Sequence, residues 1–167
     1  DVLEQRFAAL EGGAAAICVS SGQAAIFYAV SNVAEAGDNI IISDKLYGGA
    51  ITLLTYTLKR FGISAKVFKS DDASNLEELI DNKTKAIFFE SLSNPQIAIA
   101  DVEKIVEIAK RHGVLTICDN TVASAALFNP ISWGIDVVVH STSKYTNGQG
   151  TTIGGIIVER DGLAEFF

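Results

Sequence analysis

The chain has 167 residues, 49% of them hydrophobic, and a net charge of −7. This length suffices for one domain with a buried core, and the composition is typical of a globular protein rather than a disordered one. The acidic charge disfavours nucleic acid as a partner because phosphates would be repelled, and no apolar run reaches the ~20 residues that a membrane-spanning helix requires.

Seven short apolar runs predict the strands of a sheet. They are apolar on successive residues instead of alternate ones, which is typical of parallel strands covered by helices on both faces. In chain order the runs cover residues 14–19, 39–43, 64–69, 85–90, 114–119, 136–140 and 153–159.

Amphipathic patterns between these runs predict helices. The opening segment is helical up to a glycine pair, and no residue that could cap it comes before it. Further helices are predicted over residues 23–36, 49–61, 74–80 and 101–112. The 74–80 helix begins with a capping box, Ser74 followed by Glu77, and residues 161–167 resemble the start of another helix.

This alternation of strands and helices predicts a three-layer α/β/α fold with a mostly parallel sheet. We find no linker or repeat, so residues 1–167 are expected to form one domain. The absence of Met suggests a segment of a longer protein. A start without signal-peptide character and two cysteines without metal-ligand spacing favour a cytoplasmic location.

Polar residues follow five of the predicted strands. Ligands of open α/β sheets bind beyond the carboxyl ends of the strands, so each such junction is a candidate site. After the first strand, Ser21, Gly22 and Gln23 place backbone N–H groups at a helix N-terminus, which suits a phosphate. A plain helix cap is the alternative.

Tyr47 and Asn94 follow two other strands. Two glycines after Tyr47 would let its ring lie against a planar ligand. Asn94 is biased to an extended conformation by Pro95 and could donate to a ligand oxygen. Ordinary turns are the alternatives at both places.

Asp119 and Lys144 bring opposite charges to the ends of two further strands. A carboxylate that closes a buried strand requires a cationic partner, and a buried amine requires a bonding partner as well. Ser141 and Ser143 stand before Lys144 at alternate positions and could bind one phosphate together. A helix-capping Asp and a surface Lys are the alternatives.

Together these clusters supply the groups that pyridoxal phosphate (PLP) requires. Its aldehyde requires an amine, its ring nitrogen an acid, its ring a stacking partner and its phosphate hydrogen-bond donors. We therefore predict PLP as the cofactor and no metal. The glycine-rich stretch 147–155 could pass close to a ligand, but it contains neither a P-loop nor a dinucleotide fingerprint, which disfavours a nucleotide-binding enzyme.

Longer motifs carry a resemblance to one family. They are LEQRFAALEGG, SSGQAAI, ESLSNPQ, VLTICDNTVAS and DVVVHSTSKYTNGQGTTIGG. The most specific feature is the Asp119-Asn120-Thr121 run with Ser-x-Ser-Lys, in which 25 positions separate acid and lysine. On these motifs the chain resembles, over essentially its whole length, the Cys/Met metabolism family of PLP-dependent enzymes.

The resemblance implies a role for each candidate residue. Lys144 would bond to the cofactor, Asp119 would pair with the pyridine nitrogen, and Thr121 would support the Asp119 side of the ring. Tyr47 would stack on the ring and serve as an acid for the leaving group, while Asn94 would bind the ring oxygen O3′. The phosphate would be held by Ser21, Gly22, Gln23, Ser141 and Ser143, with Gln23 in place of a Met that is common in the family.

The resemblance also implies an activity. Residues 148–155 are most similar to enzymes that make homocysteine from O-acetylhomoserine and sulfide by γ-replacement, with an amino-acid substrate, a sulfide or thiol co-substrate and assembly as a dimer of dimers. The reactions of cystathionine γ-synthase, cystathionine γ-lyase and methionine γ-lyase remain alternatives, as does an inactive truncated domain. A Tyr-x-Arg stretch and a substrate-binding Arg of the family are absent, so we expect a cofactor-binding fragment with little activity of its own.

Three remaining residues receive structural interpretations. His112 ends a helix, where the dipole favours a cation. His140 closes a strand and is interpreted as a packing residue. Trp133 is expected in the core.

Overall fold

A computed structural model describes residues 1–163 and contains one seven-stranded sheet in the order β1-β7-β6-β5-β4-β2-β3. The strands are β1 (Ala15–Val19), β2 (Asn39–Ser43), β3 (Ser64–Phe68), β4 (Thr84–Glu90), β5 (Leu115–Asp119), β6 (Val137–Ser141) and β7 (Gly155–Glu159). Only β7 runs antiparallel to its neighbours, β1 and β6. The predicted mostly parallel sheet is confirmed.

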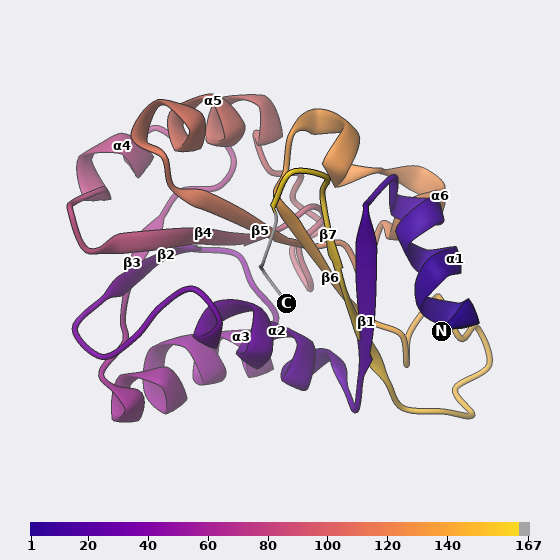
Figure 1. Cartoon of the computed structure of the whole chain (residues 1–167). Coiled ribbons are helices and arrows are strands. Elements are labelled where there is room, and N and C mark those ends of the chain that lie inside the picture. Colours follow the sequence, from indigo (N-terminus) through magenta and orange to yellow (C-terminus); the bar gives the residue numbers. More distant parts are fainter. Residues whose placement is uncertain (164–167) are drawn as a thin grey trace.

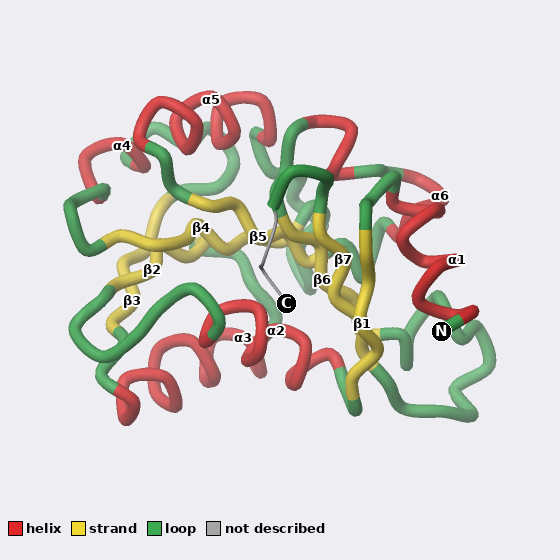
Figure 2. The backbone as a smooth tube through the Cα atoms, in the orientation of Figure 1, coloured by secondary structure: helices red, strands yellow, loops and turns green. Residues whose placement is uncertain are grey.

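Helices cover both faces of this sheet. They are α1 (Val2–Glu11), α2 (Gly22–Ser31), α3 (Gly48–Thr52), α4 (Leu76–Leu79), α5 (Val102–His112) and α6 (Ser124–Leu127). Figure 1 shows α4 and α5 on one face and α2 and α3 on the other, which confirms the three-layer α/β/α fold. In Figure 2 the loops that join these elements, drawn in green, lie beyond the ends of the strands.

Two apolar clusters fill the space between the layers. Successive strand residues point to opposite faces, so a continuous apolar run feeds both clusters. Ile40 and Ile42 of β2 pack with Leu54 on the α2 and α3 side, whereas Ile41 packs with Ile105 of α5 on the other side. The interpretation of the apolar runs as strands buried on both faces therefore holds for the inner strands, but it is wrong for the outermost strands β1 and β3, where Ile17 and Val67 are exposed.

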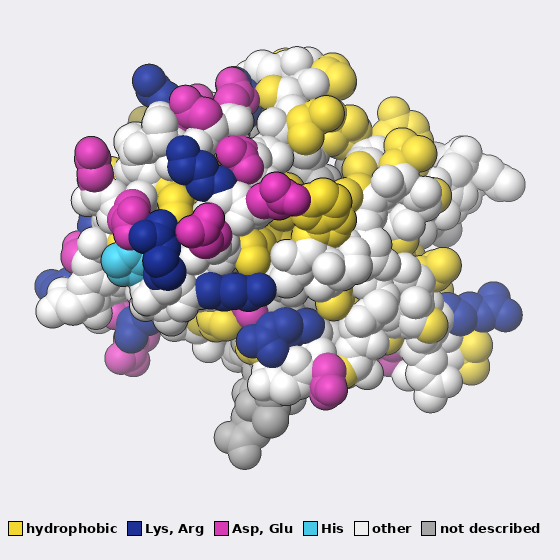
Figure 3. Space-filling model, turned by 90° about the horizontal axis from the view of Figure 1, so that it is seen from above, with side chains coloured by type: hydrophobic (Ala, Val, Ile, Leu, Met, Phe, Trp, Pro, Cys, Tyr) yellow, Lys and Arg dark blue, Asp and Glu magenta, His cyan; other side chains and the backbone are white. Residues whose placement is uncertain are grey.

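The α5 helix begins and ends as the sequence predicts. The Asp101 side chain accepts a hydrogen bond from the Lys104 N–H, and Gly113 ends the helix in the left-handed conformation. Glu77 of α4 forms an ion pair with Arg111, and its Oε1 lies 2.8 Å from Nε2 of His112, so His112 has a carboxylate partner in addition to the helix dipole. Figure 3 shows basic and acidic side chains interspersed on this face of the molecule.

Some predicted helix boundaries are wrong. The helix predicted over residues 23–36 ends at Ser31, and the last residues of that stretch form a turn in which the Asp38 carboxylate accepts from the Glu35 N–H. The Ser74–Glu77 capping box does not form, since the Asp72 side chain takes the Ser74 N–H and α4 begins only at Leu76.

The helix predicted over residues 49–61 is present but irregular. The α3 helix passes into a π turn, η1 (Leu53–Thr57), and then a 3₁₀ turn, η2 (Leu58–Phe61), which ends at Gly62. Another 3₁₀ turn, η3 (Pro130–Trp133), and the short α6 were not expected.

Two further expectations are wrong. Asp1 caps α1 with its own side chain, which accepts from the N–H groups of Leu3 and Glu4. Trp133 is not in the core: it is 48% exposed at the end of η3, where its ring packs against Phe128. The helix predicted over 161–167 has no helical turn in 161–163, and its remaining residues lie outside the described ones. In the described part of the chain, no helix is long and apolar enough to cross a membrane.

Candidate active site

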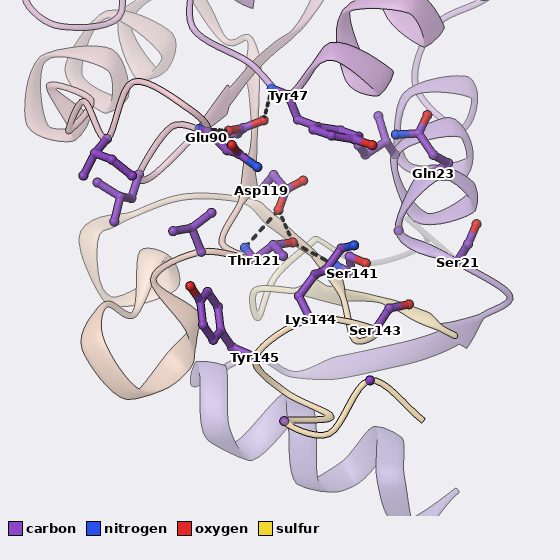
Figure 4. A pocket seen from close by; sticks show the side chains of 18 residues that line it. Ser21, Gln23, Tyr47, Glu90, Asp119, Thr121, Ser141, Ser143, Lys144 and Tyr145 are labelled. Carbon is purple, nitrogen blue, oxygen red and sulfur yellow. Dashed lines mark hydrogen bonds between the residues drawn. The ribbon is translucent and has the colours of Figure 1, made fainter. Parts of the chain in front are cut away.

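A cavity of about 680 Å³ opens at the edge of the sheet where the parallel strands end. All ten candidate residues from the sequence line it, and Figure 4 shows how eight of them lie: Ser21, Gln23, Tyr47, Asp119, Thr121, Ser141, Ser143 and Lys144. Gly22 and Asn94 complete the set. Because β7 runs antiparallel, the loop that leads into it lies at the same edge, and its Gly148 and Gly150 also line the cavity.

The N-terminus of α2 forms one side of the cavity. Ser21 caps the helix by accepting from the Ala24 N–H at 3.1 Å. The N–H groups of Gly22 and Gln23 lie in the first turn, where a helix has no internal acceptors for them. A Cβ added to Gly22 would lie 2.6 Å from the Ser141 Cβ, so only glycine lets α2 approach β6 this closely. An anion held there would meet N–H groups and serine hydroxyls together.

Asp119 stands at the end of β5 in the middle of the cavity. Its Oδ1 accepts from the Thr121 N–H at 2.9 Å and from the Thr121 hydroxyl at 2.5 Å. The Thr121 oxygen in turn accepts from the Ser141 N–H at 2.8 Å, which ties β5 to β6. Both bonds to Asp119 use Oδ1, so Oδ2 remains for a ligand such as a protonated ring nitrogen.

Lys144 lies just beyond β6, in the loop of residues 142–154, and its side chain points into the cavity (Figure 4). The expectation of a buried amine is wrong, because the cavity is open and Lys144 is exposed. Among the described residues its amine has no hydrogen-bond or ion-pair partner. Ser143 is held by the Gly154 N–H, which donates to its hydroxyl oxygen at 3.0 Å.

Glu90 is a cavity residue that the sequence analysis placed in a strand and did not consider for the site. It ends β4, is only 7% exposed, and accepts from the N–H groups of Tyr47 at 2.6 Å and Asn94 at 3.0 Å. The signal that identified Asp119, an acid that closes a buried strand, also applies to Glu90. Tyr145 was missed as well, because it follows Lys144 in a loop without a local pattern.

Burial raises the pKa values of both cavity carboxyls. Desolvation, assisted by the charge of Asp119, raises the pKa of Glu90 to about 7. Desolvation also raises the pKa of Asp119, while the hydrogen bonds from Thr121 and the nearby His140 act in the opposite direction. A cationic ligand group beside Asp119 would stabilise its ionised form.

His140 packs beneath the cavity, as interpreted, but it also has a polar partner. Its Nε2 lies 2.5 Å from Oε1 of Glu11, and both side chains are buried. Asn120 donates to the same oxygen at 3.3 Å. These contacts connect α1 with the residues that follow β5 and end β6.

The donor set of the cavity fits PLP. Hydroxyl and N–H groups at the α2 end suit a phosphate, and the free oxygen of Asp119 suits a pyridine nitrogen. The exposed Tyr47 ring offers an apolar surface, and the unpaired Lys144 amine suits an aldehyde.

Comparisons with known proteins agree with this fit. The family model described as Cys/Met metabolism PLP-dependent enzyme matches residues 1–165. A homocysteine/cysteine synthase of Saccharomyces cerevisiae is 48% identical over 160 residues, which are 95% of this chain and 36% of the yeast protein. An O-acetyl-L-homoserine sulfhydrylase of Leptospira meyeri is 44% identical over 159 residues, again 95% of this chain and 36% of the relative.

Two solved structures of similar proteins share the fold of this chain. A Campylobacter jejuni protein assigned as an O-acetylhomoserine (thiol)-lyase, which carries N′-pyridoxyl-lysine-5′-monophosphate, matches with a TM-score of 0.97 and 58% identity over 99% of this chain and 41% of that one. A cystathionine γ-lyase of Lactobacillus plantarum complexed with L-serine matches with a TM-score of 0.91 and 38% identity, over 95% of this chain and 41% of that one. The chain thus spans well under half the length of these relatives.

Proposed function

The chain belongs to the Cys/Met metabolism family of PLP-dependent enzymes, and from this premise we propose that it is the cofactor-binding part of an enzyme that makes homocysteine from O-acetylhomoserine and sulfide. The observation that carries the proposal is the convergence of Lys144, Asp119 and the α2 N-terminus on one cavity. The names of the relatives described above support the choice of reaction.

Different residues of the cavity would bind different parts of the cofactor. Asp119 would accept a hydrogen bond from the ring nitrogen, and Tyr47 would cover the ring. Asn94 would donate to the ring oxygen and Lys144 would hold the aldehyde carbon covalently. The phosphate would lie against the first-turn N–H groups of Gly22 and Gln23 and the hydroxyl groups of Ser21, Ser141 and Ser143.

Bound PLP would supply an electron-withdrawing ring that stabilises negative charge at the substrate Cα. When it is not bonded to the cofactor, the Lys144 amine would take the proton from Cα as a general base, since its side chain points into the cavity and has no competing partner among the described residues. The Asp119 carboxylate would keep a proton on the ring nitrogen. The Tyr47 hydroxyl would donate a proton to the leaving acetate, and sulfide would add at Cγ to give homocysteine.

We extend the proposal to the assembly and location of the protein. Lys144 is the only cationic side chain among the described residues that line the cavity, and Tyr145, which also lines it, is strongly exposed. A second subunit that covers the mouth of the cavity would supply the missing positive charge. This supports a dimer, and we propose in addition that two dimers associate and that the protein is cytoplasmic.

Another reaction of the family is the alternative. The cystathionine γ-lyase structure shares the fold with a TM-score of 0.91, so the frame of the cavity alone does not choose between replacement and elimination. A substrate panel on the full-length protein distinguishes them. Homocysteine from O-acetylhomoserine and sulfide is the expected product, and release of a keto acid and ammonia as the dominant reaction would favour the alternative.

The role of Lys144 has a direct test. Borohydride reduction of the full-length protein with PLP should leave a pyridoxyl adduct on the peptide that contains Lys144, as detected by mass spectrometry. Lys144→Ala should abolish the adduct and lower turnover by at least about 10²-fold. Lys59→Ala, on the exposed η2 turn, serves as the control and should retain both. An adduct on another lysine in the Lys144→Ala protein would refute the assignment.

A further inference from the structure

Glu90 is the cavity carboxylate to which the proposed function gives no task. It ends β4, and its two oxygens accept from two different loops. Oε1 binds the Tyr47 N–H beyond β2 at 2.6 Å, and Oε2 binds the Asn94 N–H beyond β4 at 3.0 Å. Figure 4 shows Glu90 turned toward the Tyr47 backbone.

We propose that Glu90 is a positioning residue that links the loop of Tyr47 to the loop of Asn94. This link would fix the distance between the Tyr47 ring and the side-chain amide of Asn94. The strands β2 and β4 are paired only as far as Ile42 and Phe88, so the sheet itself does not hold the two loops together beyond that point. The consequence for cofactor binding rests on the proposed function, whereas the contact between the loops does not.

A carboxylate suits this position for a simple reason. Ionised carboxyl oxygens only accept hydrogen bonds, so one side chain satisfies two N–H groups at once, and bonds to a charged acceptor are the stronger ones. Glutamine has the same size but offers one acceptor and one amide donor. In Glu90→Gln the amide donor would face a backbone N–H, and one loop would be released.

Protonation of Glu90 should have the same effect as this substitution. A protonated carboxyl also presents one carbonyl oxygen and one group that carries hydrogen, and the pKa of Glu90 is about 7. The other titratable groups of the cavity are Asp119 from β5, Tyr47 from the loop after β2, and Lys144 and Tyr145 from the loop after β6. These groups are common to both proteins, so a ratio of wild type to variant retains only the change that Glu90 itself causes in their titration, chiefly in that of Asp119.

The first test follows the two amides in the cofactor-free full-length protein. Hydrogen exchange of the Tyr47 and Asn94 N–H groups at pH 8.5 should be about tenfold faster in Glu90→Gln for at least one of them, the loss expected for a bond to a charged acceptor. Glu159→Gln is the matched control. Glu159 pairs with Ala15 and Val137, at the end of the sheet where the parallel strands begin, and its substitution should leave the exchange rates of both backbone N–H groups unchanged. Unchanged exchange in Glu90→Gln would overturn the proposal.

The second test measures PLP dissociation constants. The ratio of Glu90→Gln to wild type should be about tenfold at pH 8.5 and approach one at pH 6, where Glu90 is protonated. A ratio that is the same at both pH values would mean that Glu90 only fills space. If wild type does not bind PLP, the proposed function fails, but the exchange rates still decide the role of Glu90.

A wild-type measurement covers the case in which Glu90→Gln does not fold. Protection of the Tyr47 and Asn94 amides, relative to the Ile41 amide inside β2, should then rise between pH 6 and pH 8.5. A flat relative protection over this range would refute the role of Glu90.

Discussion

At Gly22 the first turn of α2 touches the end of β6. A Cβ at this position would lie 2.6 Å from the Cβ and 3.0 Å from the Cα of Ser141, distances that no side chain tolerates without movement. The same backbone turn presents the N–H groups that the phosphate would meet. Gly22 therefore serves packing and binding together, because α2 must lie close to Ser141 for both.

Gly22→Ala should separate α2 from β6. Overpacking of this kind lowers the free energy of unfolding by about 1–3 kcal/mol, and the shift of Ser141 should also weaken PLP binding. Urea unfolding and PLP titration measure the two effects. Gly48→Ala is the control for stability, since a Cβ there meets nothing within 4 Å and should leave the free energy of unfolding unchanged. Equal effects of the two substitutions would contradict this explanation.

At the residue scale, the position of a polar group after a strand was enough to identify most of the site. Asp119, Thr121 and Lys144 were found because parallel strands deliver their last residues to one edge. Glu90 closes its strand as Asp119 does, so the same signal applied to it, but no local pattern predicts its contact with the Tyr47 N–H group, 43 residues away in sequence. The burial of Lys144 was predicted wrongly, since the openness of a cavity has no local signature.

At the element scale, α5 illustrates what a sequence determines well. The structure has the predicted apolar stripe and ends the helix at Gly113, as predicted. Asp101 caps the helix, which begins within one residue of the predicted start. The Ser74 capping box failed because Asp72 competes for the same N–H group. The antiparallel direction of β7 arises because the 142–154 loop turns the chain back at the end of β6 without a crossover to the other end of the sheet. No local sequence pattern predicts this turn.

The cap of α5 can be tested by substitution. Asp101→Ala removes the acceptor of the Lys104 N–H and should lower the free energy of unfolding by about 1 kcal/mol. Urea denaturation at neutral pH is the measurement. Glu107→Ala, at an exposed position of the same helix, should change stability by less than about 0.5 kcal/mol. A loss at Asp101 no larger than at Glu107 would mean that the cap does not contribute.

At the scale of the whole molecule, the charge of the cavity is unbalanced for the proposed ligands. Its described lining contains two carboxylates, Glu90 and Asp119, and one cation, Lys144. A phosphate and a substrate carboxylate would add negative charge, while the only amine is engaged by the aldehyde. Anions are stabilised by cationic or N–H partners, and the α2 N-terminus supplies N–H groups for one of them, so we expect further cations from outside these residues for the other.

The 167 residues alone should therefore fold and bind PLP weakly but form no homocysteine above background. The full-length protein, with the additional length found in its relatives, should turn over O-acetylhomoserine and sulfide. Circular dichroism checks the fold of the short chain, PLP absorbance checks binding, and a thiol assay of the product checks turnover. Turnover by the short chain within about tenfold of the full-length protein, a difference of about 1.4 kcal/mol in activation free energy, would show that Lys144 and the α2 N-terminus suffice for both anionic groups.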